Sequence, residues 1–159
     1  MAAQPSIAPQ LPTARDRQYW FFGMLAEVKA SAAVTGGRYT LVEMTAPAGL
    51  EAPLHVHYRD DEGFYVLEGS LTVQVGEETV EVGAGRHVFG PRDVPHRFTV
   101  GPEGARMLWV LTPGGFEDLI GEASVPAERP TVPPPSVVPP ANAADIVRRH
   151  GNELLEARP

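Results

Sequence analysis

The chain has 159 residues, 43% of them hydrophobic, which is the size and composition of one globular domain. Its formal net charge of −7 argues against nucleic-acid and membrane-surface partners. The absence of cysteine excludes a disulfide framework, a thiolate ligand and a thiol nucleophile. Residues 1–17 lack the apolar core of a signal peptide, and no run reaches the ~20 apolar residues of a membrane span, so we expect a cytoplasmic protein.

The first two thirds of the chain predict a flexible arm followed by an all-β domain. Residues 1–18 contain prolines and alanines without periodicity, and we expect them to form a flexible N-terminal arm. From residue 19 to residue 121, β-favouring runs alternate with glycine-rich turns about every 8–12 residues, a rhythm typical of an all-β sandwich or small barrel. The predicted strands are residues 19–28, 38–45, 54–57, 62–67, 71–75, 79–82, 87–89, 96–100 and 106–111.

The last third predicts short helices and a proline-rich segment. A short helix is expected over residues 114–121, and a last helix ends before Gly151. Seven of the sixteen residues from 125 to 140 are proline, which favours an extended, polyproline-like strap. We expect residues 122–159 to pack on the barrel or on a dimer mate; the alternative is a binding motif for the aromatic groove of a partner.

Two motifs within the predicted barrel carry its chemistry. Residues two apart on a strand point to the same face, whereas on a helix they lie roughly 200° apart. His55 and His57 therefore project two imidazoles from one strand, and the polar turn after them allows Glu62 to fold back beside them. The first motif is G-x5-H-x-H-x4-E-x6-G, made by Gly49, His55, His57, Glu62 and Gly69. The second contains Gly85, Pro91, Pro95 and His96.

Three imidazoles and one carboxylate are the ligands of a borderline metal ion. His55, His57, Glu62 and His96 suit one divalent transition metal per chain: iron, nickel, manganese, cobalt, copper or zinc. A carboxylate-only set would have indicated calcium or magnesium instead. Four protein ligands leave one or two coordination positions open on a five- or six-coordinate ion, which is typical of a catalytic metal. His87 and His150 fit no ligand pattern.

These two motifs resemble those of the cupin superfamily. The first matches at every defining position, and the second departs at Asp93, where glycine is usual, and at Val100, where asparagine is frequent. Further segments, such as Trp20 to Gly23 and Pro113 to Glu117, are similar to single-domain cupins of the quercetin 2,3-dioxygenase type. The resemblance spans about residues 19–155 and implies a double-stranded β-helix, or jelly-roll, barrel.

The resemblance implies a metal-dependent dioxygenase with O2 as co-substrate. The expected substrate is a small, flavonol-like phenol or enol that binds the metal through a deprotonated hydroxyl. Glu62 is expected to serve both as a ligand and as the catalytic base, because an ionised carboxylate only accepts hydrogen bonds. Cupins of this type are often dimers, so we expect a homodimer.

Side-chain parity predicts the substrate pocket. Phe64 and Val66 share the strand face of Glu62, and Phe98 shares that of His96. Met44 and Trp109 are further candidates, and the aromatic segment of residues 20–22 is placed either over the barrel mouth or in a dimer contact. Ordinary burial in the barrel core is the alternative for each of these side chains.

Two other functions use the same residues. A polyketide-type cyclase or an isomerase would use the metal as a Lewis acid and need no oxygen. A small-molecule-binding cupin would hold a structural metal, or none, and would have no turnover. Oxygen uptake separates the first alternative from a dioxygenase, and the presence of an open coordination position separates the second.

Overall fold

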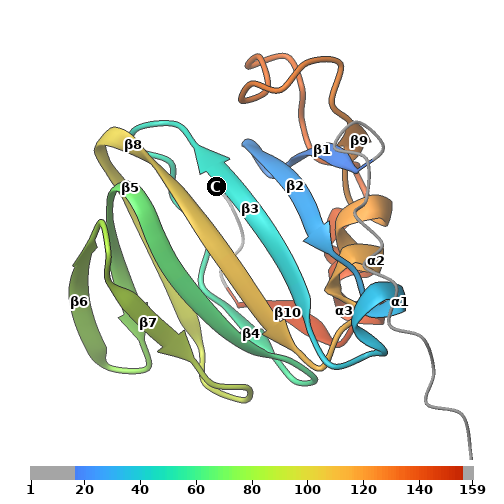
Figure 1. Cartoon of the computed structure of the whole chain (residues 1–159), viewed down its shortest axis with the longest axis horizontal. Coiled ribbons are helices and arrows are strands. Elements are labelled where there is room, and N and C mark those ends of the chain that lie inside the picture. Colours follow the sequence, from blue (N-terminus) through green and yellow to red (C-terminus); the bar gives the residue numbers. More distant parts are fainter. Residues whose placement is uncertain (1–16, 156–159) are drawn as a thin grey trace, which may run out of the picture.

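Long antiparallel strands dominate the computed structural model, which describes residues 17–155 (Figure 1). In chain order the strands are β1 (Gln18–Phe21), β2 (Met24–Ala30), β3 (Thr40–Ala46), β4 (His55–His57), β5 (Asp61–Val75), β6 (Glu78–Gly83), β7 (His87–Gly90), β8 (His96–Thr112), β9 (Val125–Pro126) and β10 (Asn152–Leu154). The helices are α1 (Ala32–Thr35), α2 (Phe116–Glu122) and α3 (Ala143–Arg149). The predicted all-β architecture with short helices is confirmed.

The strand β8 is the hub of the sheet. It pairs with β3 and β4 on one side and with β5 on the other, and the order β10-β4-β8-β3-β2-β1-β9 continues the sheet away from it. The strands β6 and β7 pair with the far edge of β5. In Figure 1 these two strands lie at one end of the molecule, whereas α2 and α3 lie at the other.

Some predicted strand boundaries differ from the structure, because a glycine that suggests the end of a strand in the sequence only bends the strand in the structure. Residues 62–67 and 71–75 belong to one strand, β5, and residues 96–100 and 106–111 belong to one strand, β8. Glycines bend these strands without ending them, because the partner strand bends at the same place. Conversely, the predicted strand 19–28 is a hairpin that turns at Phe22 and Gly23.

The bend of β5 and β8 brings together Glu62 and His96, which a flat sheet would hold far apart. On β8, His96 pairs with Val75, whereas Glu62 pairs with Leu111. Thirteen residues of extended strand separate Val75 from Glu62, a span of about 43 Å at 3.3 Å per residue. Yet the imidazole Nε2 of His96 lies 3.1 Å from the carboxylate of Glu62. The sheet therefore curls back on itself and closes around the site.

The interior of the curled sheet holds the core. Burial alternates residue by residue along β3, as expected for a strand with one face inward. Most of the fully buried hydrophobic side chains come from β3, β5 and β8; they include Val42, Met44, Phe64, Val66, Leu71, Val73, Met107 and Leu111, and Ile120 of α2 joins them. Aromatic rings of β5 and β8 pack edge to face there, with Phe64 5.9 Å from both Phe98 and Trp109 between ring centroids.

The C-terminal third returns to its own barrel. The start of the proline-rich strap pairs with β1, and the indole N–H of Trp20 donates a 2.8 Å hydrogen bond to the carbonyl of Thr131. After α3, β10 pairs with β4, the strand of two candidate ligands. The helix α3 begins after Asn142, whose side chain makes no capping hydrogen bond, and it ends before Gly151 as predicted. Within residues 17–155, no helix is long and apolar enough to cross a membrane.

The corner of the sheet predicts a severe effect of a single methyl group. Gly69 has φ of 74°, and a Cβ there would lie 1.9 Å from the carbonyl oxygen of Gly104. We expect Gly69→Ala to lower the free energy of unfolding by about 3–5 kcal/mol, because steric overlap adds to the left-handed backbone. Gly85 has φ of 79° and open space around its Cβ position, so Gly85→Ala is the control and should cost about 1–2 kcal/mol.

Urea unfolding of the two variants measures this difference. Equal losses in Gly69→Ala and Gly85→Ala would show that close backbone approach does not constrain the corner.

Candidate metal centre

The short strand β4 presents two imidazoles because it is held on both sides. Its neighbours are β10, where Asn152 pairs with His57, and β8, where His96 pairs with His55. Pairing on both sides keeps β4 extended, so His55 and His57 point to the same face. The parity predicted from the sequence is therefore imposed by strands from distant parts of the chain.

The loop before β8 delivers His96 to the same place. Asp93 donates its backbone N–H to the carbonyl of His57 at 2.7 Å, which ties this loop to β4. Asp93 occupies the position where cupins usually have glycine, and its φ is 65°. Aspartate is among the few side chains that adopt this left-handed conformation with some ease. The turn thus keeps a positive φ although the residue differs.

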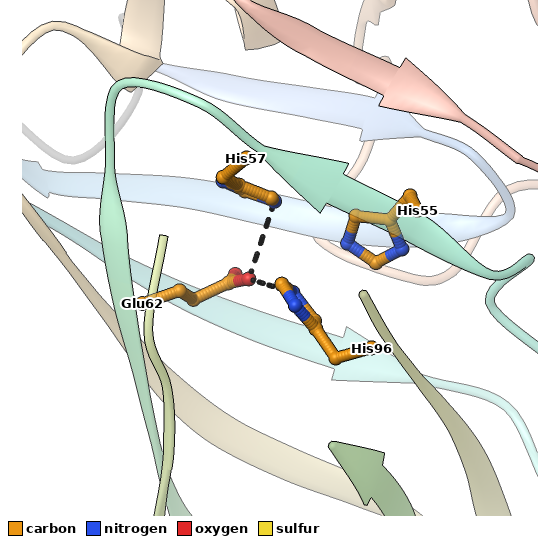
Figure 2. Close-up of side chains that lie close together, drawn as sticks. All are labelled: His55, His57, Glu62 and His96. Atoms are coloured by element: carbon orange, nitrogen blue, oxygen red, sulfur yellow. Dashed lines mark hydrogen bonds and ion pairs between the residues drawn. The ribbon is translucent and has the colours of Figure 1, made fainter. Parts of the chain in front are cut away.

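Four candidate ligand atoms converge on one point (Figure 2). His55, His57, Glu62 and His96 each offer an atom within 4.8 Å of all the others. The Oε2 atom of Glu62 lies 3.1 Å from His96 Nε2 and 3.5 Å from His57 Nε2. Two ligands at about 2.1 Å from one ion are about 3.0 Å apart in octahedral and about 3.4 Å apart in tetrahedral geometry. The observed spacing therefore fits a single bound ion.

Backbone carbonyls orient two of the three imidazoles. His55 Nδ1 lies 2.8 Å from the carbonyl oxygen of Pro53, and His96 Nδ1 lies 3.0 Å from that of Val94. A carbonyl oxygen only accepts hydrogen bonds, so each Nδ1 carries a hydrogen and donates it. In a neutral ring this leaves the lone pair on Nε2, which is the atom turned to the site.

The contact between His96 and Glu62 requires a cation. If His96 is neutral, the lone pair of its Nε2 faces a carboxylate oxygen at 3.1 Å, and both atoms are acceptors. Both side chains are almost fully buried, so water does not screen this repulsion. Either a proton on Nε2 or a metal ion removes the conflict. The donor set thus fits a divalent transition metal.

The pKa values in the cluster follow from burial and from its one carboxylate. Burial lowers the pKa of His55 to about 4, with a further contribution from the charge of His96. Burial also lowers the pKa of His57, although Glu62 opposes it. For His96, burial is outweighed by the hydrogen bond and the charge of Glu62, so its pKa is raised. Burial raises the pKa of Glu62, but the charges of His57 and His96 hold it below its ordinary value.

An apolar cavity of about 80 Å³ opens beside the ligands. It is lined mainly by aromatic and aliphatic side chains, and no arginine or lysine is among the described residues of its wall. The ring of Phe116, from α2, stacks on His57 with 5.5 Å between ring centroids. The lining residues are Phe21, Phe22, Met24, Leu50, Glu51, Ala52, Pro53, His55, His57, Glu62, Phe98, Trp109, Phe116, Leu119, Val147, Asn152 and Leu154.

The structure divides the five predicted pocket residues into two groups. Phe98 and Trp109 line the cavity, whereas Phe64, Val66 and Met44 are buried in the core and do not reach its wall. Parity placed Phe64 and Val66 on the correct face of β5, but the rings of Phe98 and Trp109 pack against Phe64. Strand parity identifies a face; which part of that face meets a cavity depends on the curl of the sheet.

Other lining residues were missed because they come from the C-terminal third. Val147 of α3, together with Asn152 and Leu154 of β10, reaches the cavity from the segment that was expected only to pack outside the barrel. No local sequence pattern predicts that these residues line the cavity, because their position depends on the pairing of β10 with β4. Phe21 and Phe22, from the aromatic segment predicted at the barrel mouth or in a dimer contact, border the cavity, and so do Phe116 and Leu119 of the predicted helix over residues 114–121.

Of two charged residues near the site, Asp60 is buried and Arg92 is exposed. Asp60 is 8% exposed, and its carboxylate lies 3.9 Å from His57 Nδ1, an atom that has no hydrogen-bond partner in the described part of the chain. Burial and the charge of Glu62 raise the pKa of Asp60 to about 6. Arg92, by contrast, is held at the surface by Asp61 at 2.7 Å and lies outside the cavity wall.

Comparison with known proteins identifies the family. Residues 41–111 match the Cupin domain family, so this part of the chain is a cupin domain. Its fold is similar to that of an RmlC-like cupin from Shewanella frigidimarina, with a TM-score of 0.57 and 20% identity over 67% of this chain and 93% of that one. The four converging residues form the kind of metal site that cupins carry.

Curated relatives include enzymes of two kinds. The chain is 36% identical to quercetin 2,3-dioxygenase of Aspergillus japonicus over 92 residues, 54% of this chain and 26% of that enzyme. It is 27% identical to quercetin 2,3-dioxygenase of Bacillus subtilis over 104 residues, 65% of this chain and 31% of that enzyme. It is also 37% identical over 74 residues to polyketide synthase CurC of Streptomyces cyaneus, 46% of this chain and 48% of that protein. The chain thus spans less than a third of each dioxygenase.

The cluster predicts one divalent transition metal per chain. Replacing one ligand, as in His57→Ala or His96→Ala, should weaken metal binding by more than the roughly 10–100-fold that changes around a metal site cost. The exposed His87 lies outside the cluster, so His87→Ala is the control and should keep full occupancy. Elemental analysis after equilibrium dialysis measures the metal content; equal occupancy in all three variants would contradict the assignment.

The lowered pKa of His55 predicts acid sensitivity of the metal-free protein. Between its ordinary value near 6.5 and about 4, His55 takes up a proton in the unfolded chain but not in the folded chain, so its contribution to stability falls as the pH drops. At about 1.4 kcal/mol per pKa unit, His55 accounts for about 3 kcal/mol. The raised pKa of His96 adds stability that is already complete below pH 6.5, so it does not offset this slope. The raised pKa of Asp60 does oppose it, because the folded chain protonates Asp60 from about pH 6 downward, so the contribution of His55 is the difference between the wild-type protein and a His55 variant.

Urea unfolding of chelator-treated protein at several values between pH 7 and 4.5 tests this dependence. His55→Gln should flatten the curve, and an unchanged slope in that variant would contradict the role of His55.

Proposed function

We propose that this cupin is a metal-dependent dioxygenase that cleaves a flavonol-like phenolic or enolic substrate with O2. The observation that carries the proposal is the meeting of a three-histidine, one-glutamate cluster with an aromatic cavity whose described wall has no cationic side chain. The partial similarity to two quercetin 2,3-dioxygenases supports the same class of reaction.

The cavity wall favours a flat, uncharged molecule with one acidic hydroxyl. Phe98, Trp109 and Phe116 supply ring edges and faces, and the ring centroids of Trp109 and Phe116 are 6.4 Å apart. Without arginine or lysine in the described wall, a substrate with several negative charges would have only a bound metal to neutralise it. A phenol or enol that loses one proton on binding meets this condition.

Glu62 is the group placed to accept that proton. It is 1% exposed, its pKa is held below the ordinary value, and its carboxylate lies at the centre of the cluster. An ionised carboxylate in this position can take the hydroxyl proton of a bound substrate within hydrogen-bond distance. The buried aromatic surroundings keep bulk water from competing for the resulting anion.

A bound divalent metal would supply Lewis acidity at His55, His57, Glu62 and His96, lowering the pKa of the substrate hydroxyl. In a dioxygenation of this class, both atoms of O2 enter the organic products. The cleaved carbon–carbon bonds of the substrate supply the electrons, so no external reductant is needed. The cavity residues then act by orienting the substrate and excluding water.

A non-oxidative cyclase or isomerase is the second candidate. The similarity to polyketide synthase CurC over about half of that protein favours it, and the same four ligands would serve. In this reaction the metal would polarise a carbonyl, while Glu62 would move a proton between carbon and oxygen of an enolisable substrate. Such a reaction consumes no oxygen.

Oxygen uptake by metal-loaded protein distinguishes the two candidates. We expect uptake that depends on quercetin, a related flavonol or a smaller phenol, and a drop in kcat of about 10²–10⁴-fold in Glu62→Gln, because the proton acceptor is lost while an oxygen ligand remains. Glu81→Gln, a change on the exposed strand β6, is the control and should keep the uptake. Conversion of a substrate under argon, without oxygen uptake, would replace the dioxygenase with the cyclase or isomerase.

A further inference from the structure

The hairpin between β1 and β2 holds a phenylalanine in a conformation that phenylalanine rarely adopts. Phe21 pairs with Met24, so Phe22 and Gly23 form a two-residue turn, with φ of 48° and 85°. Positive φ at both positions is the mark of a type I′ turn, in which Asn-Gly is the favoured pair. A bulky side chain with positive φ is strained, and such strain persists where the surrounding structure holds it.

Contacts on both sides hold this turn in place. A Cβ at Gly23 would lie 2.9 Å from Leu50 Cδ1, so the turn packs closely on the loop before β4. The rings of Phe21 and Phe22 meet edge to face with 4.7 Å between centroids, and Phe21 continues to Phe116 at 6.4 Å. Next to the turn, β1 pairs with β9, and the indole N–H of Trp20 donates a hydrogen bond to the carbonyl of Thr131 in the strap.

The strained residue lies at the rim of the metal cavity. Phe22 lines the cavity but is only partly buried, unlike its neighbour Phe21. The cavity is partly open to solvent, and its inner space is about 80 Å³, less than the roughly 150 Å³ of an engineered cavity that binds benzene. A three-ring flavonol exceeds this inner space, so part of such a substrate must lie at the rim beside Phe22.

We propose that Phe22 is a specificity-determining residue that limits how far a substrate with several rings reaches into the cavity. The strained turn keeps its phenyl ring at the rim, and larger molecules reach the ligands only when the hairpin tip moves. This inference rests on the proposed function only in taking the cavity as the substrate site. It extends that proposal by naming what selects substrate size and why phenylalanine stands where asparagine would relieve the strain.

Phe22→Asn separates selectivity from folding, because Asn-Gly suits the turn better than Phe-Gly. The probes are catechol, with one ring, and quercetin, with three fused or linked rings, added anaerobically to nickel- or zinc-loaded protein and followed by calorimetry. We expect quercetin to bind at least tenfold more tightly to the variant, while the affinity for catechol changes less than threefold. The Tm should stay level or rise. Val80→Asn, on exposed β6, is the control and should leave both affinities unchanged.

Equal affinity of quercetin for the wild-type protein and Phe22→Asn, including binding to neither, would overturn the proposal. A lower Tm with an unchanged ratio of the two affinities would also overturn it, since it would make Phe22 a packing residue. Phe22→Gly, which also suits positive φ, repeats the test without a polar side chain. A changed affinity ratio in a protein that consumes no oxygen would leave Phe22 in this role and remove only the dioxygenase assignment.

Discussion

The curl of the β5–β8 ladder is the constraint on which the site depends. Glu62 and His96 lie near opposite ends of this pair of strands, yet their side chains touch at 3.1 Å. A bend at Gly69 and Gly104, where the two backbones approach too closely for a side chain, turns the sheet back on itself. The metal ligands are therefore close because the barrel closes, and the closure uses Gly69, which belongs to the same sequence motif as His55, His57 and Glu62.

Once the site is closed, its electrostatics demand a positive charge. Two carbonyl groups set the tautomers of His55 and His96, and Glu62 then meets imidazole lone pairs in a place that water does not reach. A proton on His96 satisfies this arrangement in the metal-free protein, whereas a divalent ion satisfies three imidazoles at once. The same buried carboxylate that makes a cation necessary is also the group placed to accept a substrate proton.

The cavity beside this site is assembled from both ends of the chain. The β1–β2 hairpin contributes Phe21 and Phe22, and the C-terminal elements contribute Phe116, Val147 and Leu154. The proline-rich strap connects the two regions, because it pairs with β1 before the chain reaches α3 and β10. The proline-rich strap thus supports the rim of the cavity through β1 and leads the chain to β10, which pairs with the strand that carries His55 and His57.

Residue identity and short-range spacing are enough to predict the candidate ligand set, the extended strand that carries His55 and His57, and the all-β cupin architecture. These properties depend on residue identity and on spacing within a few residues, which a motif records directly. Three other features follow from tertiary contacts. Asp60 is buried, and Phe22 lies at the cavity rim with a positive φ. Phe64 and Val66 belong to the core, whereas Phe98 and Trp109 line the cavity. Each of these depends on how far the sheet curls and on pairings such as Asn152 with His57, which join residues remote in the chain. Local patterns carry no record of such contacts.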